Sequence, residues 1–200
     1  MTNTTLEYEA WECEREALGL EKVARWVYPI RLAMKMKKVA EAWERVDRLE
    51  KVAEFRQKAA EYCAKTNVRP GEKNWSYEDI AQFWKKAKIS WRKLGQSDKV
   101  AEAYRKQIGA YLKLAEYQEI EVGGREKEIK DLGYESNPAL SYFDQDSSRI
   151  SVLYENVAKT FRKLGQSDKV AEFRQKARNS RRAHDEQIKK YLMGLKGEAK

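Results

Sequence analysis

The sequence has little of what several protein classes need. Two cysteines, Cys13 and Cys63, are too few and too far apart for a disulfide framework, so we expect two reduced thiols on helix faces. With one histidine, His184, and no CxxC or HxxxH spacing, no metal site is expected. No stretch approaches the roughly 20 apolar residues that a membrane-spanning helix needs. Because no basic and apolar leader follows Met1, the expected location is the cytoplasm.

Glycine and proline are also scarce, with 10 and 3 among 200 residues. Hydrophobic residues make up 42% and charged residues 36%, which excludes collagen-like and low-complexity chains. The 11% of aromatic residues argues against intrinsic disorder. The chain carries 41 basic and 32 acidic residues, so its formal net charge is +9. These values are typical of a basic, helix-rich protein in water.

Apolar residues recur at three- and four-residue steps along almost the whole chain, which is the period of an amphipathic helix. The predicted fold is therefore all-α, with antiparallel helical hairpins that stack as a short array or pack as an irregular helical bundle. We expect a single domain over residues 1–200. Its predicted parts are N-terminal helices with a degenerate repeat (6–65), a second repeat with an extended helix (76–122), an irregular connection (125–148), and a third repeat with a basic C-terminal helix (149–193).

The strongest internal signal is a duplication. Residues 91–102 read WRKLGQSDKVAE and residues 161–172 read FRKLGQSDKVAE, so eleven consecutive residues are identical. A weaker copy, WERVDRLEKVAE, spans 43–54, and its continuation FRQKA at 55–59 is identical to 173–177. Each copy predicts two helices joined by a tight turn, with an apolar stripe that needs a neighbour.

The predicted turn follows from local chemistry. Gly95 or Gly165 can adopt the left-handed backbone conformation that ends a helix. Ser97 or Ser167, or the aspartate after it, can cap the helix that follows. In contrast, we expect Gly123-Gly124 to weaken or end the extended helix.

The copies resemble the tetratricopeptide repeat family in the order of large, small, aromatic and glycine positions. These positions are Tyr154, Val157, Ala158, Phe161, Gly165, Val170, Phe173 and Ala177 in the third copy; Trp84, Ala87, Trp91, Gly95, Val100 and Tyr104 in the second; and Met36, Val39, Ala40, Trp43, Val52, Phe55 and Ala59 in the first. Asp47 stands where the first copy would have its glycine. The copies start 48 and 70 residues apart, against about 34 in tandem members of the family, so the extra length is predicted to be loop or longer helix.

In that family, inward-facing residues of each unit's first helix line a groove that receives peptides. The resemblance therefore implies a partner-binding surface formed by Lys37, Lys85, Lys86, Arg92, Asn156, Lys159 and Arg162. Lysine and arginine side chains favour a carboxylate-rich segment through charge-assisted hydrogen bonds. The alternative is that these residues form the solvated faces of the helices. Glu41 and Ile89 stand where chaperone-binding relatives have polar clamp residues, so that clamp is not expected.

A second basic feature is the C-terminal segment. From Arg174 to Lys200, nine lysines or arginines oppose three acids, which supplies +6 of the total charge. Nucleic acid or another acidic surface could contact this segment. The candidate residues are Arg178, Arg181, Arg182, Lys189 and Lys190. A helix that caps the repeat array explains the same residues, because Ile188, Tyr191, Leu192 and Leu195 form an apolar face.

No phosphate loop, nucleophile elbow or HExxH motif occurs, and the carboxylates are scattered, so neither catalysis nor a cofactor is expected. Asp144-x-Asp146-x-Ser148 is similar to a calcium loop, but it lacks the glycine and is better explained as a helix N-cap. The predicted function is a non-catalytic protein–protein interaction module, an adaptor or scaffold that holds an acidic peptide or protein surface. The alternatives are a basic helical nucleic-acid-binding protein and a structural subunit that self-associates through Trp11, Trp26 or the 125–148 segment.

Overall fold

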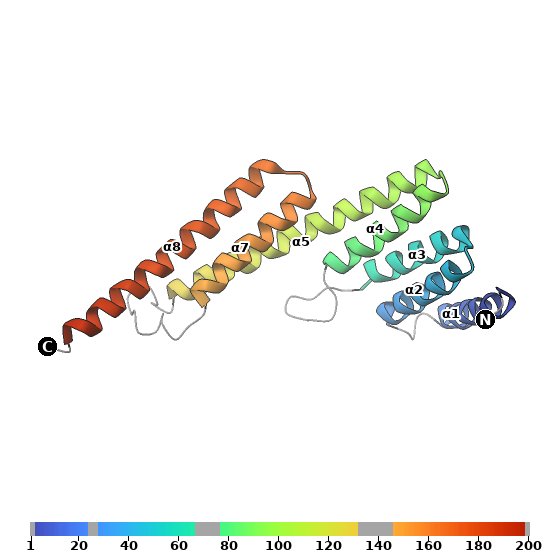
Figure 1. Ribbon diagram of the computed structural model, residues 1–200, viewed down its shortest axis with the longest axis horizontal. Helices are drawn as coiled ribbons and strands as arrows, with labels where there is room; N and C mark the ends of the chain where they lie inside the picture. The colour runs from blue at the N-terminus through green and yellow to red at the C-terminus, as the bar shows by residue number, and fades with distance from the viewer. Residues whose placement is uncertain (1–2, 24–27, 67–76, 132–145, 199–200) are drawn as a thin grey trace. The chain divides into compact units, whose positions relative to one another are not determined.

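The computed structural model describes residues 3–23, 28–66, 77–131 and 146–198, and within these ranges the chain is all-α, as predicted (Figure 1). The helices are α1 (Asn3–Lys22), α2 (Pro29–Arg45), α3 (Leu49–Ala64), α4 (Tyr77–Lys93), α5 (Ser97–Asp131), α7 (Asp146–Lys163) and α8 (Ser167–Glu198). Among the described helices, none has the length and apolar character needed to cross a membrane.

The chain divides into two compact units, where a single domain was expected. Met1–Ala110 contains α1 to α4 and the first part of α5, and Tyr111–Lys200 contains the rest of α5 with α7 and α8. Each unit has its own hydrophobic core. The first core includes Met36, Val39, Trp43 and Phe55, and the second includes Val157, Phe161 and Phe173. Since α5 is continuous, its two parts contribute to different units.

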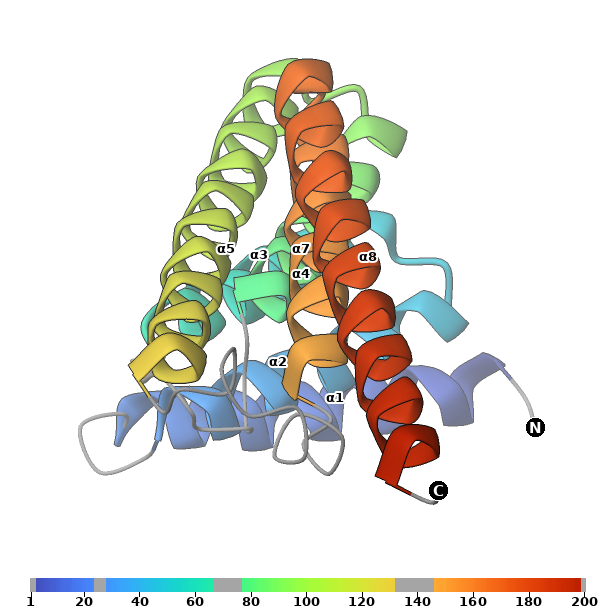
Figure 2. The ribbon, with the colours of Figure 1, turned by 90° about the vertical axis from the view of Figure 1, so that its left-hand side faces the viewer.

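The three sequence copies fold into helical hairpins with the same turn: α2–α3, α4–α5 and α7–α8. The two helices of α7–α8 run side by side in both views (Figures 1 and 2). One residue of each turn has a left-handed backbone, with φ of 69° at Gly95, 73° at Gly165 and 55° at Asp47. Its N–H donates to the carbonyl three positions back, and the next N–H donates to the carbonyl five positions back, at 3.1 to 3.3 Å. This is the Schellman motif, so the predicted left-handed turn is confirmed and extends to the copy with aspartate. The predicted caps are not confirmed, because α5 and α8 begin at Ser97 and Ser167 themselves, one position after the N-cap.

Replacing Gly95 with alanine is expected to lower the free energy of unfolding by about 1–2 kcal/mol, because a Cβ is strained at positive φ. An added Cβ at Gly95 or Gly165 would meet no atom within 4 Å, so the cost is backbone strain alone and should be similar at both. Asp47→Gly should have the opposite sign and raise stability by less than about 1 kcal/mol. Urea unfolding measures all three variants, and an unchanged Gly95→Ala variant would contradict the left-handed turn.

Helix α5 is longer than the sequence indicated. It continues through Gly123 and Gly124 to Asp131, so residues 125–131 are helical and do not begin an irregular connection. Residues 132–145 of the predicted connection lie outside the described ranges. The following helix, α7, begins at Asp146, three residues before the predicted start. Similarly, α1 continues through Gly19 and α8 continues to Glu198.

Tertiary contacts explain why α5 does not end at its two glycines. Glycine in a helix interior costs about 1 kcal/mol relative to alanine. Val122, just before them, is 3% exposed within the second core, and Ile129, after them, packs against that core. The Tyr154 hydroxyl of α7 also donates a hydrogen bond to the Glu126 carboxylate. Burial against α7 therefore offsets the local preference to end the helix.

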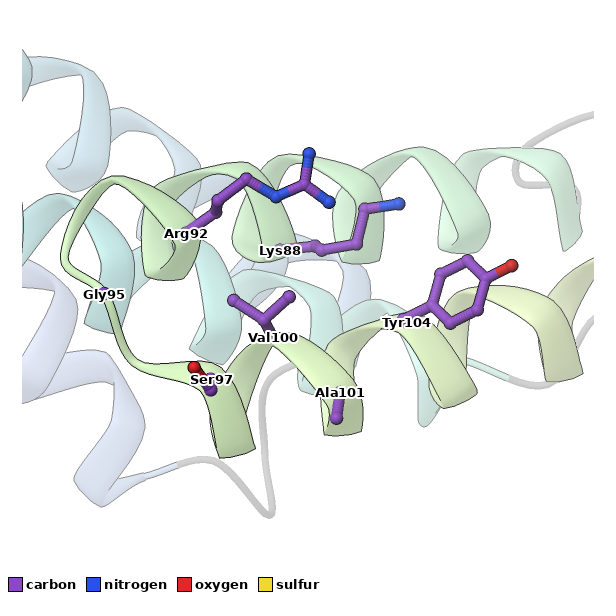
Figure 3. Close-up of a pocket in the computed structure, with 7 residues that line it drawn as sticks. All are labelled: Lys88, Arg92, Gly95, Ser97, Val100, Ala101 and Tyr104. Carbon is purple, nitrogen blue, oxygen red and sulfur yellow. The ribbon is translucent and has the colours of Figure 1, made fainter.

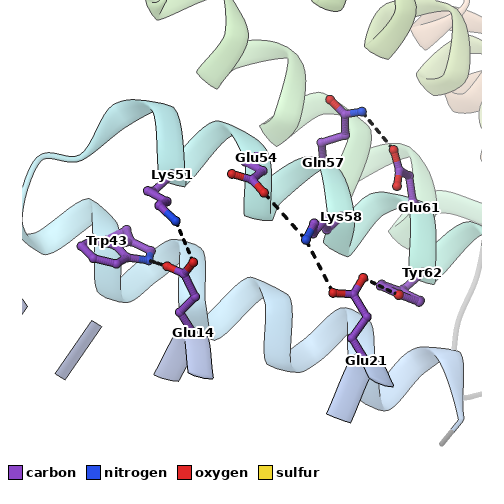
Figure 4. Close-up of polar contacts among 9 residues, drawn as sticks. All are labelled: Glu14, Glu21, Trp43, Lys51, Glu54, Gln57, Lys58, Glu61 and Tyr62. Carbon is purple, nitrogen blue, oxygen red and sulfur yellow. Dashed lines mark hydrogen bonds and ion pairs between the residues drawn. The ribbon is translucent and has the colours of Figure 1, made fainter. Parts of the chain in front are cut away.

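Buried and half-buried carboxylates attach α1 to the first hairpin (Figure 4). Glu14, 5% exposed, accepts hydrogen bonds from the Trp43 indole Nε1 at 2.7 Å and from Lys51 Nζ at 2.7 Å. Two turns further along α1, Glu21 accepts a hydrogen bond from the Tyr62 hydroxyl at 2.7 Å. Burial, followed by the hydrogen bond and charge of Glu21, raises the pKa of Tyr62 to about 12. These contacts place α1 across α2 and α3.

Candidate functional site

The seven residues predicted to line one partner-binding groove fall into two groups. Lys37 lies on α2, and Lys85, Lys86 and Arg92 lie on α4 of the first unit, whereas Asn156, Lys159 and Arg162 lie on α7 of the second unit. Each group is therefore a separate candidate surface, one in the first unit and one in the second.

Lys37 and Lys86 line a common hollow between α2, α3 and α4, together with Glu41 and Arg56. Lys37 Nζ lies 3.5 Å from the Glu41 carboxylate. Arg56 donates a hydrogen bond to Glu44 at 2.6 Å. Acids of α2 thus neutralise two of the three cations at this hollow. Lys85 is exposed beside it on α4.

Another hollow of the first unit, of about 430 Å³, lies between α4 and α5 at their turn, and we name it the α4–α5 groove. It is lined by Lys88, Arg92, Gly95, Ser97, Val100, Ala101 and Tyr104 (Figure 3). In Figure 3, Lys88 and Arg92 extend from α4 and Tyr104 extends from α5. Tyr104 is 51% exposed, Ala101 is exposed and Val100 is half-buried, so the floor is apolar and open. Of the predicted site residues, only Arg92 lines this groove.

Lys88 is a partly desolvated cation of the groove, and it was not among the predicted site residues. Lys88 Nζ donates a hydrogen bond to Gln107 Oε1 at 2.9 Å and lies 4.8 Å from the centre of the Tyr104 ring. Desolvation, followed by the charges of Arg92 and Lys85, lowers the pKa of Lys88. A carboxylate placed nearby would compensate for this loss of hydration.

Alignment of the three copies would have identified Lys88. The equivalent residues are Ala40 and Ala158, which are 1% and 2% exposed. A lysine at a position that holds alanine in two copies signals a local change in the contact between the helices. Gln107 is the matching change on α5, because its equivalents are also alanines, Ala59 and Ala177.

The prediction that Tyr104 supplies the core aromatic of the second copy is wrong. Phe55 and Phe173 are 1% and 5% exposed, and their equivalent on α5 is Ala103, which is 1% exposed. Tyr104 stands one residue later and lines the α4–α5 groove instead. Ala103 is smaller than the phenylalanines of the other two copies, whereas Lys88 and Gln107, which hydrogen-bond to each other, are longer than the alanines there.

In the second unit, the predicted residues of α7 lie at its surface. Lys159 and Arg162 are exposed, and Lys159 Nζ lies 3.4 Å from Asn156 Oδ1. The predicted cations of α8 are exposed too, namely Arg178, Arg181, Arg182 and Lys189. Arg181 lies 3.5 Å from Glu155 of α7. The side chain of Lys190 is outside the described part.

A hollow of about 520 Å³ in the second unit lies between α5, α7 and α8, and Tyr154 and His184 line it. His184 is half-buried, and its Nδ1 has no hydrogen-bond partner among the described residues. Burial, followed by the hydrogen bond to Glu126, raises the pKa of Tyr154 well above its usual value. Tyr154 is therefore held neutral as a structural donor.

The described residues include no group of three or more histidine, cysteine or acidic side chains that could hold a metal ion. The side chains of the calcium-like residues Asp144, Asp146 and Ser148 lie outside the described part of the chain. Both cysteines are free thiols, as expected.

Cys63 is expected to resist alkylation in the folded protein. It is 0% exposed, and burial raises the pKa of its thiol to about 12, whereas Cys13 is only half-buried. We expect iodoacetamide to modify Cys13 at least about 100-fold faster than Cys63, measured by mass spectrometry at pH 8. The raised pKa also means that Cys63 favours the folded state below pH 9.0, its ordinary value, and loses this contribution as the pH rises toward 12. Equal modification rates would contradict the buried site.

No protein-family model matches the chain, and searches of curated proteins and of solved structures found no similar protein. Functional inference therefore rests on the repeats and on the chemistry of the α4–α5 groove.

Proposed function

We propose that the chain is a tetratricopeptide-like, non-catalytic interaction module of the cytoplasm that holds an acidic peptide or protein surface. The observation that carries this proposal is the α4–α5 groove, where the described lining residues include Lys88 and Arg92 but no acid. Carboxylates are the natural ligands of such a groove, because ammonium and guanidinium groups donate strong charge-assisted hydrogen bonds.

The repeat geometry supports the family resemblance. Three hairpins share one turn motif, although their sequences differ at the turn residue, which is Asp47, Gly95 or Gly165. Each hairpin packs an aromatic residue from its first helix into its core: Trp43, Trp91 and Phe161 are 2%, 7% and 6% exposed. Stacked helical hairpins commonly present extended binding surfaces, and those of the first unit carry exposed cations on α4.

The two nearly identical copies provide a matched pair of charge-reversal variants. Arg92 and Arg162 occupy the same position of the identical eleven-residue segment, and both are exposed. With a labelled glutamate-rich peptide at about 150 mM salt, we expect Arg92→Glu to weaken binding about tenfold or more, measured by fluorescence anisotropy. Arg162→Glu should leave the affinity within about twofold, because that residue lies in the other unit.

Several outcomes would count against this assignment. Equal loss in both variants would indicate attraction by the net charge alone. Loss only in Arg162→Glu would move the site to the second unit, and no binding of acidic peptides by the unmodified chain would reject the proposal. A lysine-rich peptide of the same length is the control for charge sign.

Nucleic-acid binding is the second candidate, and the exposed arginines of α8 favour it. Arg174, Arg178 and Arg182 repeat at four-residue intervals, so they share one helix face, and all three are exposed. Binding through phosphates should fall steeply between about 50 and 200 mM salt. A complex with RNA or DNA that persists at physiological salt would favour this function over the adaptor.

Self-association is the third candidate. Trp11 is 54% exposed on α1, while Trp26 and residues 132–145 lie outside the described ranges. A mass that rises with protein concentration in sedimentation, and that Trp11→Ala returns to one chain, would support a self-associating subunit.

A further inference from the structure

The α4–α5 groove has a counterpart in the first hairpin. Lys88, Arg92, Val100, Ala101 and Tyr104 correspond to Ala40, Glu44, Val52, Ala53 and Arg56, which we name the α2–α3 groove. The two grooves come from the same repeat and have the same turn, so their positions on the two hairpins are equivalent.

Helix α4 covers the α2–α3 groove. Val52 and Ala53 are 1% and 0% exposed there, whereas their equivalents on α5 are half-buried and exposed. Arg56 of α3 donates to the Ser90 hydroxyl of α4 at 2.9 Å. Trp91 Nε1 of α4 donates to Gln57 Oε1 of α3 at 2.9 Å. The α2–α3 groove is therefore a docking site for a helix.

The second unit contains a similar contact. Thr160 of α7 is equivalent to Ser90 of α4, and its hydroxyl lies 2.8 Å from Gln118 Oε1 of α5. In the first unit, the partner of Ser90 is Arg56, and the residue of α5 that corresponds to Arg56 is Tyr104. A contact at the same sequence positions would therefore join Thr160 to Tyr104. Gln118 lies 14 positions later, about four helical turns along α5. The helix that follows the second hairpin thus docks on the later part of α5, and Tyr104 is left 51% exposed.

The two grooves differ in charge. Around the α2–α3 groove, Lys37 and Arg56 balance Glu41 and Glu44, so the net charge is zero. The equivalent residues of the second hairpin are Lys85, Ile89, Arg92 and Tyr104, with a net charge of +2. Lys88 and Arg105, which correspond to the uncharged Ala40 and Gln57, raise it to +4. A helix docked there with matching charge would be acidic.

We propose that the α4–α5 groove docks an acidic amphipathic α-helix of a partner protein, placed on α4 and α5 as α4 is placed on α2 and α3. This inference rests on the proposed function for the acidic character of the partner, and it adds the partner's conformation and its position. Apolar side chains of the helix would cover Val100, Ala101 and Tyr104, and its carboxylates would pair with Lys88, Arg92 and Arg105. Binding of this type places side chains at three- and four-residue intervals into the groove.

The third hairpin is a less suitable docking site for such a helix. Arg174 and Lys159 stand there in place of Tyr104 and Ile89, so the surface is charged where the α4–α5 groove is apolar. Ala171 is exposed and occupies the position of Ala101. Ala171→Trp is therefore a control for Ala101→Trp, because it makes the same change at an equivalent exposed alanine of the other unit.

The test uses the full chain and a helix-stabilised peptide of 17 residues, the length of α4. One face of the peptide carries phenylalanine, alanine and serine at the spacing of Phe83, Ala87 and Ser90 in α4. Glutamates stand on both sides of this face. We expect it to bind, and we expect Ala101→Trp to weaken binding about tenfold or more by filling the groove. Ala171→Trp should change the affinity less than about twofold. Because Ala101 is exposed, the Ala101→Trp variant is expected to fold, and circular dichroism checks this. The double variant Arg92→Glu with Arg105→Glu is the second variant, and it should also weaken binding because it reverses the charge of the groove.

A peptide of the same composition with a central proline separates this inference from the proposed function. We expect the proline peptide to bind about tenfold more weakly or worse, because proline interrupts the helix. If it binds as well as the helical peptide and Arg92→Glu weakens both, the helix inference is wrong while the acidic partner is retained. If neither peptide binds, the proposed function fails as well. A further outcome is that the unmodified chain binds no peptide but forms a dimer, and that Ala101→Trp abolishes this dimer. This result would show that a second copy occupies the groove, and it would overturn the acidic partner.

Discussion

Replacing Trp91 with alanine is expected to lower the free energy of unfolding by about 3–5 kcal/mol. The Trp91 side chain is 7% exposed on α4, and its Nε1 donates to Gln57 on α3 at 2.9 Å. Lys99 of α5 places its Nζ 3.8 Å from the Trp91 ring centre. The ring therefore joins three helices, and its removal leaves a cavity and takes the Trp91 donor from Gln57 Oε1.

Phe161→Ala is the equivalent variant in the second unit, and we expect a loss of similar size, about 3–5 kcal/mol. Phe161 is 6% exposed and stacks on Phe173 with ring centres 5.5 Å apart and planes inclined by 14°. Hydrogen exchange should locate each loss: Trp91→Ala should weaken protection in α3 and α4, and Phe161→Ala in α7 and α8. A cost below about 1 kcal/mol at either position would contradict its burial.

Trp91→Phe is the control for the size of the side chain. It introduces the aromatic residue that the third copy already has, so the fold should tolerate it. We expect a smaller loss of about 1–2 kcal/mol, because Gln57 loses its donor and the ring loses volume. A loss as large as that of Trp91→Ala would mean that the indole hydrogen bond, and not packing, dominates.

Local chemistry made much of the fold predictable. Helix α3 (Leu49–Ala64) lies within the predicted N-terminal helices of residues 6–65, and it begins directly after the Asp47 turn. The glycines at 95 and 165 marked their turns because a left-handed residue is required there. Asp47 shows that the turn persists without glycine, since aspartate tolerates this conformation better than most residues.

Contacts distant in sequence account for what was not predictable. Glu126 and Val122 keep α5 helical by packing against α7, whose Tyr154 lies 28 residues after Glu126. Nothing in a local window reports that contact. The division into two units has the same origin, because the spacings of 48 and 70 residues do not reveal which part of α5 receives α7.

The candidate site was predictable in type and only partly in position. A basic surface on the first helix of each repeat was expected, and Arg92 does line the α4–α5 groove. Lys88 was missed, although its signal was present in the alignment of the copies, where two alanines correspond to it. Tyr104 was placed with Val100 among the repeat positions of the second copy, four residues after it. Only the packed structure distinguishes it from the neighbouring Ala103, since the buried face of α5 is set by where α4 lies.

Glu14→Ala is expected to lower the free energy of unfolding by about 2–3 kcal/mol, because a buried carboxylate with two charge-assisted hydrogen bonds is removed. The Trp43 indole N–H, donated to Glu14 at 2.7 Å, would be left unpaired beside a ring that is 2% exposed. Lys51 contributes less, since its side chain is 36% exposed and its ion pair with Glu14 is partly screened by water.

Glu21→Ala is the matched control on the same helix. Glu21 accepts a hydrogen bond from Tyr62 and lies 3.5 Å from Lys58, but its side chain is 28% exposed, so we expect a loss of about 1 kcal/mol or less. A double-mutant cycle of Glu14→Ala with Trp43→Phe should give a coupling of at least about 1 kcal/mol, which would assign the effect to the indole hydrogen bond. If Glu21→Ala costs as much as Glu14→Ala, the burial of Glu14 is not what holds α1 to the first hairpin. If Glu14→Ala costs more, as expected, hydrogen exchange should show α1 losing protection before α4, because α1 depends on this contact and α4 does not.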